Sequence, residues 1–316
     1  MKKILITLSL LIIGFTSYSQ EHLQPLKYYK VAFHIVRTSA GTTNITGLEL
    51  DIQKAIKYMN DKFIGANIQF YTCGINYIDD DLYYNYNQDY NRDKILVANY
   101  NDNTAVNAYL FNSITDLWGY TYLPKRWELD KLNIIGLRHE IIHGQLVTVT
   151  HEFGLFFGIP HTHEYGGELV NRENCTTHGD LFCDTPADPE LHFSDDVDEN
   201  CDYIGGAVDA NGQEYDPDES LIMSHARHEC RTRFSQKQLA EANFFANHAI
   251  RIGFSHMQYF ENTTITTDYD IEEDVILIKN TKIENNAEVK LKSCAFVEIS
   301  GDSEVELGST LDITIE

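Results

Sequence analysis

Apolar and polar positions in the first part of the chain follow the periods of one strand and one helix. Residues 28–37, YYKVAFHIVR, are rich in β-branched and aromatic side chains and predict a largely buried strand. From Gly47 to Phe63 apolar residues recur at helical spacing, and Thr46 is the expected N-cap. His34 lies inside the strand, so we expect it to be a hydrogen-bonded core residue and not a metal ligand.

The pattern then favours a mixed α+β domain. Strands are predicted at residues 68–71, 105–112, 119–123 and 132–137. Residues 78–93, rich in Tyr, Asp and Asn, are typical of a long exposed loop. A strand, a helix, several strands and a further helix make an α+β domain with a mixed, twisted sheet, which we expect to occupy residues 20–258.

Apolar pairs at a short, regular spacing predict a different module at the end of the chain. They are Val289-x-Leu291, Val297-x-Ile299, Val305-x-Leu307 and Leu311-x-Ile313. Such a period indicates stacked short strands or a small solenoid, which we assign to residues 259–316. We expect a soft linker at residues 261–270, and we find no catalytic constellation in this module.

The N-terminus and the charge indicate an exported protein. Residues 1–19 combine Lys2 and Lys3, an apolar stretch too short to cross a bilayer and a small-x-small cleavage pattern, as in a secretory signal peptide. The mature chain would begin near Gln20, and no later stretch predicts a membrane span. A formal charge of −24 without a basic stripe argues against nucleic-acid binding.

Six cysteines fit an extracellular location. Four of them, Cys175, Cys183, Cys201 and Cys230, crowd into one region, which in an exported protein indicates disulfides and not zinc thiolates. Four cysteines allow three pairings, and the residues alone do not choose among them. We expect Cys73 and Cys294 to stay free or to pair weakly.

Two segments begin like the zinc signature His-Glu-x-x-His, which works because residues four apart share one face of a helix. His139-Glu140-Ile141-Ile142-His143 matches it fully. Gly144 follows at once, near a transition from strand to loop, so we interpret residues 139–143 as an exposed polar loop. His151-Glu152 lacks the second His, because position 155 is Leu.

The second segment nevertheless contains the longer pattern. Gly158 and His161 fall where His-Glu-x-x-His-x-x-Gly-x-x-His requires them. In that pattern the helix stops at the Gly, which adopts a positive φ, and the turned chain delivers a third His. Pro160 agrees with a helix that has already ended, and Met223 lies in a candidate methionine turn.

The sequence here resembles the metzincin zinc endopeptidases, and within them the pappalysin-like group. The resemblance lies in TVTHEFGLFFGIPHTHE, NCTTHGDLFCDTPADP and IMSHARHECRTRFSQKQ, and it spans roughly residues 28–250. It implies a catalytic domain split by a cleft, with a long zinc-site helix as the cleft floor. It also implies that the segment Gly119, Tyr120, Thr121 and Tyr122 is the edge strand that pairs with an extended peptide substrate.

Residue by residue, the resemblance implies zinc ligands at His151 and His161, a general base at Glu152 and the methionine of the turn at Met223. It also implies the disulfides Cys175–Cys201 and Cys183–Cys230. Because some relatives bind calcium, Asp180, Asp184 and Asp188 are candidate calcium ligands.

The chain departs from the family at two positions near the metal. Leu155 stands at the middle ligand and offers no lone pair, and His225 stands where the family commonly has Tyr. His225 is therefore the candidate substitute ligand, whereas Leu155 is expected to pack with Phe156 and Ile159. We expect His163, His178 and His228 to be surface or loop residues.

Three functions remain open. The first is a secreted, monomeric zinc endopeptidase that cleaves extracellular peptides or proteins by water attack. The second is an inactive pseudoprotease that binds a peptide or a protein partner in the same cleft. The third is a structural or adhesive protein whose terminal module carries the function.

Overall fold

The computed structural model describes residues 26–126, 131–248 and 257–316, so the predicted signal peptide lies outside the described residues. The first part is built on a sheet with strand order β2-β1-β5-β8-β7, and β3 also pairs with β1. All of these pairs are parallel except β7 with β8, so the predicted mixed sheet is confirmed. The strands are β1 (Lys27–Arg37), β2 (Ile68–Tyr71), β3 (Ile75–Asp79), β5 (Val106–Phe111), β7 (Gly119–Thr121) and β8 (Ile135–Arg138).

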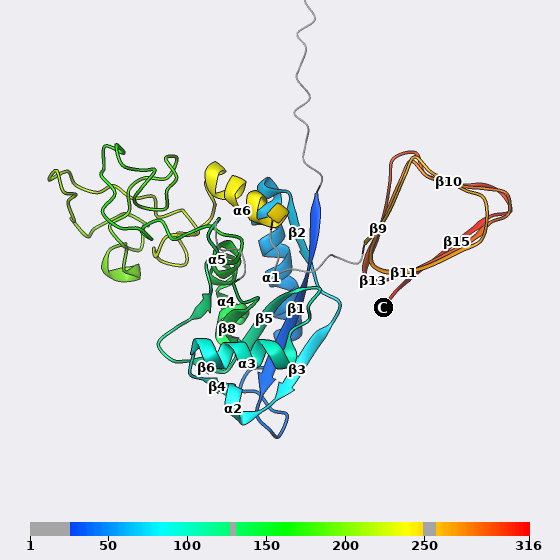
Figure 1. Cartoon of the computed structure of the whole chain (residues 1–316), viewed down its shortest axis with the longest axis horizontal. Helices are drawn as coiled ribbons and strands as arrows, with labels where there is room; N and C mark the ends of the chain where they lie inside the picture. The colour runs from blue at the N-terminus through cyan, green and yellow to red at the C-terminus, as the bar shows by residue number, and fades with distance from the viewer. Residues whose placement is uncertain (1–25, 127–130, 249–256) are drawn as a thin grey trace, which may run out of the picture.

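Helices cover both faces of this sheet (Figure 1). One face packs on α1 (Leu48–Phe63), α4 (His139–Gly144) and α5 (Leu146–Phe156), through a core that includes Phe33, Met59 and Phe153. The other face packs on α2 (Asp81–Tyr84) and α3 (Tyr90–Tyr100), largely through tyrosines. His34 lies on this second face, is 2% exposed and bonds to Asn107, as expected of a core histidine.

Two local predictions for this part are wrong. Thr46 does not cap α1: the N-cap is Gly47, at φ 80°, and it makes no side-chain capping bond. Residues 78–93 are not one exposed loop, because they contain α2, the short strand β4 (Asn85–Tyr86) and the start of α3. Asp89 caps α3 by accepting from the backbone N–H groups of Asn91 and Arg92.

After α5 the chain is mostly irregular up to α6 (Gln236–His248). The short 3₁₀ helices of the described residues are η1 (Ile64–Ala66) and η2 (Phe193–Asp195), and β6 (Ser113–Ile114) pairs with β4. None of the helices in the described ranges has both the length and the apolar character needed to cross a lipid bilayer.

The last part is a parallel β solenoid, drawn in orange and red in Figure 1. Its strands stack in two sheets, β9-β11-β13-β15 and β10-β12-β14, with every pair parallel. They are β9 (Met257–Glu261), β10 (Thr264–Ile265), β11 (Tyr269–Lys279), β12 (Lys282–Ile283), β13 (Glu288–Ser300), β14 (Glu304–Val305) and β15 (Thr310–Ile315). The predicted stacked module is confirmed. The predicted linker at 261–270 is wrong, because this segment lies within the first coil and buries Ile265.

Candidate metal centre and cleft

Helix α5 carries His151 and Glu152, and both are buried. Its residues 147–156 are all buried. The helix ends as predicted: Gly158 adopts φ 82°, and a Cβ there would overlap the ring of Phe245 on α6. The chain turns at this glycine and carries His161 back toward His151.

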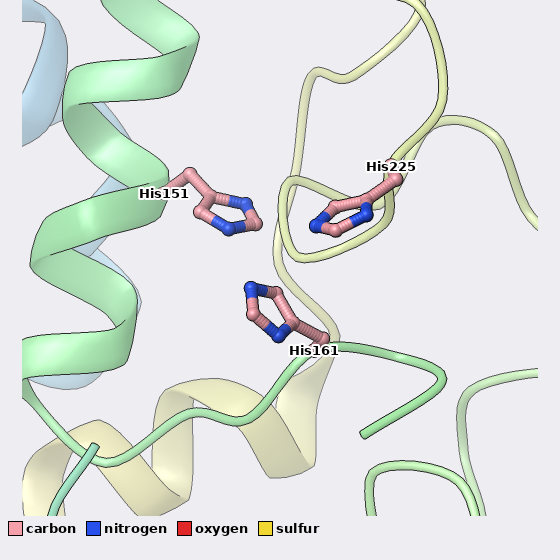
Figure 2. Close-up of side chains that lie close together, drawn as sticks. All are labelled: His151, His161 and His225. Carbon is pink, nitrogen blue, oxygen red and sulfur yellow. The ribbon is translucent and has the colours of Figure 1, made fainter. Parts of the chain in front are cut away.

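Three imidazoles meet in front of α5, as Figure 2 shows. The ring centroids of His151 and His161 lie 5.0 Å apart, and the ring of His225 lies 6.0 Å from the first and 4.8 Å from the second. One nitrogen from each of the three falls within 4.8 Å of the others. The two histidines of the long pattern thus converge, and the substitute proposed for position 155 joins them.

The hydrogen bonds of these rings suit a metal. His151 donates from Nδ1 to the carbonyl of Ile222 at 2.8 Å, and His161 donates from Nδ1 to Oε2 of Glu164 at 2.8 Å. Each bond places the ring proton on Nδ1 and leaves Nε2 as a lone-pair donor, which is the usual arrangement behind a ligating histidine. Three imidazoles are also the donor set of many catalytic zinc sites, so the residues present fit zinc.

Burial keeps the rings in the form that binds metal. It lowers the pKa of His151 well below its usual value, with smaller contributions from His161 and Arg231. Burial, together with the neighbouring histidines His161 and His163, lowers the pKa of His225 to about 2. Both rings are therefore neutral at physiological pH, and neutral imidazole is the ligand form.

Met223 lies beneath the helix. It is fully buried, and a Cβ added at Gly154 would come 2.6 Å from its Sδ. The glycine therefore lets the methionine pack directly against α5, and the carbonyl of Ile222, next to it, orients His151. A methionine beneath the helix is what the resemblance implies for the methionine turn.

Leu155 has two environments. It is 5% exposed and belongs to the main hydrophobic core with Phe156 and Ile159, as its apolar side chain predicts. It also lines the cleft beside His151. Its isobutyl group thus borders the three imidazoles without offering them a donor atom.

Glu152 is buried in the cleft wall. Its Oε2 has no hydrogen-bond partner among the described atoms, and burial raises the pKa of the carboxyl to about 8, against the opposing charge of Arg231. Gly119 of β7 makes room for it, because a Cβ there would lie 2.9 Å from Cγ and from Oε1 of Glu152. In its ionised form this carboxyl group, which lies beside three imidazoles, can accept a proton from a reacting water.

Arg231 was not found from the sequence. Arg231 is 3% exposed, and its Nη1 lies 3.4 Å from the carbonyl of Ile222 and 3.3 Å from that of Ser224. Nη2 donates to Nδ1 of His228 at 2.6 Å. A single cation thus braces the loop that carries His225. No local pattern marks such a residue, because its partners come from distant segments.

A cleft of about 390 Å³ runs over the imidazoles. Its walls come from the edge strand and the segment before it, from α5 and from the loops that carry His161 and His225; the residues are Asp116, Leu117, Trp118, Gly119, Tyr120, Thr121, Thr148, His151, Glu152, Leu155, His161, Phe193, His225, His228 and Arg231.

The predicted substrate strand lies along this cleft as β7. It ends the sheet and pairs only with β8 in the sheet order, so its other side is an edge. The hydroxyls of Tyr120 and Tyr122 donate to the carboxylate of Asp93, at 2.8 and 2.6 Å. Tyr86 donates to the same carboxylate at 2.6 Å. Asp93, another residue that the sequence did not reveal, thereby anchors β7 to α3.

The full His-Glu-x-x-His segment is helix α4 and not an exposed loop, which corrects the sequence interpretation. His139 is fully buried and donates from Nε2 to the carbonyl of Leu110 at 2.9 Å. His143 pairs instead with Asp51 of α1, its Nδ1 lying 2.6 Å from Oδ2. The two rings have separate partners, and α4 contributes no residue to the cleft.

Among the other histidines, His163 and His228 lie in irregular segments, as predicted for surface or loop residues, and both are half-buried. His163 stacks on His161 with centroids 5.2 Å apart and contacts His225 edge-on at 4.5 Å. His178 lies in a turn, where its Nδ1 is 2.9 Å from Oγ1 of Thr177.

The predicted disulfides Cys175–Cys201 and Cys183–Cys230 are wrong. The bonds are Cys175–Cys183 and Cys201–Cys230, so each cysteine pairs with its neighbour in sequence order within the irregular region. The resemblance predicted that these four cysteines form two disulfides, but it did not predict the pairing. The order of cysteines along the chain does not determine which of them meet in space.

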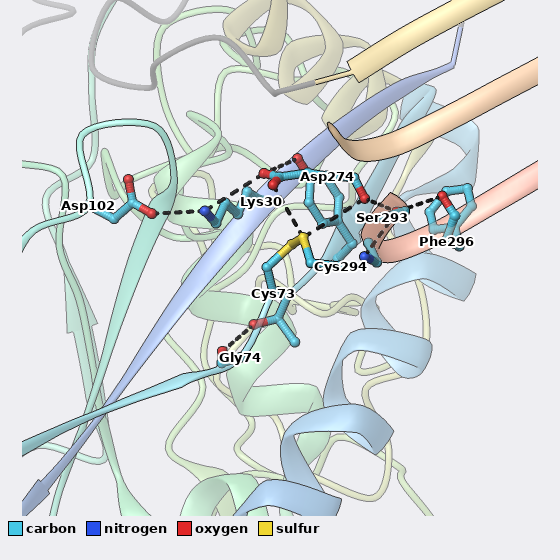
Figure 3. Close-up of a disulfide and its surroundings, with 11 residues drawn as sticks. Lys30, Cys73, Gly74, Asp102, Asp274, Ser293, Cys294 and Phe296 are labelled. Atoms are coloured by element: carbon cyan, nitrogen blue, oxygen red, sulfur yellow. Dashed lines mark hydrogen bonds and ion pairs between the residues drawn. A yellow bond between two sulfur atoms is a disulfide. The ribbon is translucent and has the colours of Figure 1, made fainter. Parts of the chain in front are cut away.

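Cys73 and Cys294 are not free, which is a second correction. They form a disulfide between the turn after β2 and the solenoid, as Figure 3 shows. Beside it, Asp274 lies 3.7 Å from Nζ of Lys30 and accepts a hydrogen bond from the hydroxyl of Tyr71 at 3.3 Å. The solenoid is therefore bonded covalently to the first sheet.

The candidate calcium ligands already have protein partners. Asp180 accepts from the backbone of Phe182 and from Thr185. Asp184 accepts from Ser235 and Lys237, and Asp188 accepts from Thr162, Glu190 and Leu191. Within the described ranges these carboxylates do not gather into a common group of ligand atoms.

Comparisons with known proteins found distant relatives. No protein-family model matches the sequence. Two curated relatives align over 171 residues: an extracellular metalloprotease of Sordaria macrospora at 28% identity, and extracellular metalloprotease NCU07200 of Neurospora crassa at 27%. Each alignment covers 50% of this chain and 55% of the relative, so the chain spans about half the length of the curated relatives it matches.

Among solved structures, mirolysin in complex with compound 9 is similar with a TM-score of 0.51, over 72% of this chain and 94% of that chain, at 14% identity. Mature mirolysin of Tannerella forsythia in complex with a cleaved peptide has a TM-score of 0.49, with 72% and 98% coverage and 16% identity. The first likeness shows the fold, which is the α+β fold of that structure.

Proposed function

We propose that the chain is a secreted zinc metalloendopeptidase, of the pappalysin-like type within the metzincins, whose metal is held by His151, His161 and His225. The observation that carries the proposal is the meeting of three imidazoles, with ligand nitrogens within 4.8 Å, beside a buried carboxyl group in an open cleft. The two relatives named as extracellular metalloproteases support the same activity.

His225 takes the place of the ligand that Leu155 cannot supply. A catalytic zinc site ordinarily has three protein ligands and one open position. His151 and His161 provide two, and the loop after Met223 brings the third from the opposite side of the cleft. The hydrogen bonds from Arg231 to the carbonyls of Ile222 and Ser224 hold that loop in place.

The chemistry divides between the metal and the chain. Zinc, when bound, would polarise the scissile carbonyl and lower the pKa of a water. Glu152 lines the cleft, its Oε2 has no hydrogen-bond partner, and its ionised form would accept the proton of the attacking water. The open edge of β7 would pair with the backbone of an extended peptide and set it across the cleft.

Secretion is part of the proposal. Three disulfides join all six cysteines, which fits an oxidising compartment. The signal peptide predicted for residues 1–19 and the curated extracellular relatives point the same way.

A ligand swap tests the assignment directly. The chain without residues 1–19 should bind one zinc and cleave casein. His225→Tyr should lower zinc affinity by at least about 10-fold, since even a residue behind a ligand typically contributes that much. Leu155→His added to His225→Tyr should restore zinc and cleavage by supplying the ligand from α5.

The control is Leu155→Met, which keeps an apolar residue of similar size and should leave zinc content unchanged. Zinc content that does not fall in His225→Tyr, measured by elemental analysis, would remove His225 from the site. A double variant that binds no more zinc than His225→Tyr would show that position 155 does not face the metal.

The second candidate function is a pseudoprotease, which the position of Leu155 in the cleft wall favours. It predicts a natural chain that binds peptides but cleaves none, with cleavage appearing once Leu155→His is introduced. The same casein assay therefore separates the two functions.

A further inference from the structure

A second hollow opens beside the cleft. Its volume is about 320 Å³ and its lining residues are Trp118, Phe193, Ser194, Arg227, His228 and Glu229. Trp118, Phe193 and His228 also line the cleft, so the two spaces are continuous. We call this hollow the side pocket. A peptide lying in the cleft would have one side chain next to it.

The side pocket has aromatic walls that are open to solvent. Trp118 is 43% exposed and Phe193 is 40% exposed, although most aromatic rings of the sheet domain are buried. Their centroids lie 5.9 and 5.6 Å from that of His228. Large rings left exposed around one hollow, next to a proposed catalytic centre, are typical of a recognition site for an apolar group.

Both wall residues are held in place before any ligand arrives. The backbone N–H of Phe193 donates to the carbonyl of His225 at 2.9 Å, and its ring stacks on that histidine at 5.9 Å and 6°. The guanidinium of Arg138 lies 5.4 Å from the centroid of Trp118, and the Arg138 N–H donates to the Trp118 carbonyl at 3.1 Å. A wall fixed in advance costs a ligand little ordering entropy.

The charges around the side pocket disfavour a cation. Arg138 lies over Trp118, Arg231 donates to Nδ1 of His228, and Arg227 lies at the rim. Glu229 is the carboxylate in the lining, and it already faces Arg227 at 3.9 Å. A lysine or arginine side chain would therefore meet positive charge. A carboxylate would lose hydration between ring faces that carry negative potential.

We infer that the side pocket binds an uncharged aromatic side chain of the substrate and so determines which peptides the cleft accepts. The inference rests on the proposed peptidase function and names its substrate class. Trp118 and Phe193 are the specificity-determining residues, and the link from Phe193 to His225 sets the pocket at a fixed distance from the metal site.

The tryptophans allow a binding test that does not depend on cleavage. The sequence contains two, Trp118 and Trp127, so Trp127→Phe leaves one reporter in the side pocket. Glu152→Gln in the same chain prevents turnover. The probes are four acetylated, amidated hexapeptides of alanine with Phe, Leu, Lys or Glu at the fourth position, and the readout is the change in tryptophan emission on titration.

The Phe peptide should bind at least about 10-fold more tightly than the Lys and Glu peptides, as expected for a ring packed between rings. Phe193→Ala should reduce this preference to less than about threefold, and Phe193→Tyr, which keeps the ring, should preserve it. Circular dichroism of each variant confirms that the chain is folded.

Three results would overturn the inference: a Lys or Glu peptide that binds as well as the Phe peptide, a preference that survives Phe193→Ala, or no binding of any peptide. The proposed function is tested separately, by casein cleavage with the chain that retains Glu152. A preference for the Phe peptide without casein cleavage would support the side pocket as a binding site and contradict the peptidase function. Cleavage without such a preference would support the peptidase function and contradict the role of the side pocket.

Discussion

Helix α4 begins with a His-Glu pair, and helix α5 contains one. The two helices differ in the residues that other segments of the chain place beside these pairs. In α4 the five-residue motif is complete, yet His139 bonds to Leu110 in the core and His143 bonds to Asp51 on α1. In α5 the motif lacks its second histidine, yet His151 meets His161 and His225.

The difference lies outside the two helices. After α5, a glycine at positive φ turns the chain back, and a methionine loop supports the helix and carries a further imidazole. Neither feature follows α4. A complete local motif therefore does not make a metal site, because the ligands must also be delivered to one point by segments far apart in sequence.

The largest expected effect is on zinc binding, which should depend on α5 and not on α4. His151→Ala should lower zinc affinity by at least about 100-fold and abolish casein cleavage, since a ligand contributes more than the residue behind it. His143→Ala on α4 is the matched control and should keep full zinc content by elemental analysis. Equal loss of zinc from both variants would contradict the assignment of the site to α5.

The next effect concerns the glycine that follows each motif. Gly158→Ala should destabilise the fold by about 3 kcal/mol, because the residue has a positive φ and its Cβ would overlap the ring of Phe245. Gly144→Ala should be neutral or slightly stabilising, because a Cβ there meets nothing within 4 Å. Urea unfolding of both variants compares the two turns, and equal midpoints would refute the special role of Gly158.

A smaller effect measures what His139 does in α4. His139→Ala should cost about 2 kcal/mol of unfolding free energy, because the buried carbonyl of Leu110 loses its donor. The zinc content of the folded variant should not change. Metal loss at a temperature where the variant is fully folded would mean that α4 takes part in the site after all.

The smallest effect depends on pH. His143→Ala should cost about 1 kcal/mol at neutral pH, as is usual for the loss of one hydrogen bond, because the buried carboxylate of Asp51 keeps its bond from Lys54. Burial alone would raise the pKa of Asp51, but the bonds from Lys54 and His143 outweigh it and lower the pKa. The contribution is present above the ordinary Asp pKa and is lost as the pH falls below about 4. Urea midpoints of the two chains should therefore converge in acid, and a gap that widened there would contradict the pairing.

The sequence predicted those parts of the molecule that have a local or periodic signal. The strand at 28–37, the helix ending at Phe63, the stop at Gly158 and the stacked strands of the solenoid all follow from spacing within a few turns. The nearness of His151 to His161 belongs to the same class, because one turn joins the two.

What the sequence did not predict depends on partners that are distant along the chain. Arg231 resembles any other arginine until Ile222, Ser224 and His228 surround it. Asp93 lies in a stretch whose tyrosines and asparagines are typical of an exposed loop, and only the structure shows three tyrosine hydroxyls bonded to it. Asp89 could have indicated the helix that carries Asp93, since an Asp before a helical segment is a strong N-cap.

The disulfide joins Cys73 to Cys294, which are 221 positions apart in the sequence, and so closes the chain between them into a covalent ring. Every cleft residue from Asp116 to Arg231 belongs to this ring. A cut between residues 248 and 257 would therefore give two pieces that still run as a single band on a gel until a reductant is added. The same ring restricts the unfolded chain and lowers its entropy, so the disulfide to the solenoid stabilises the candidate metal centre, whose cleft no solenoid residue lines.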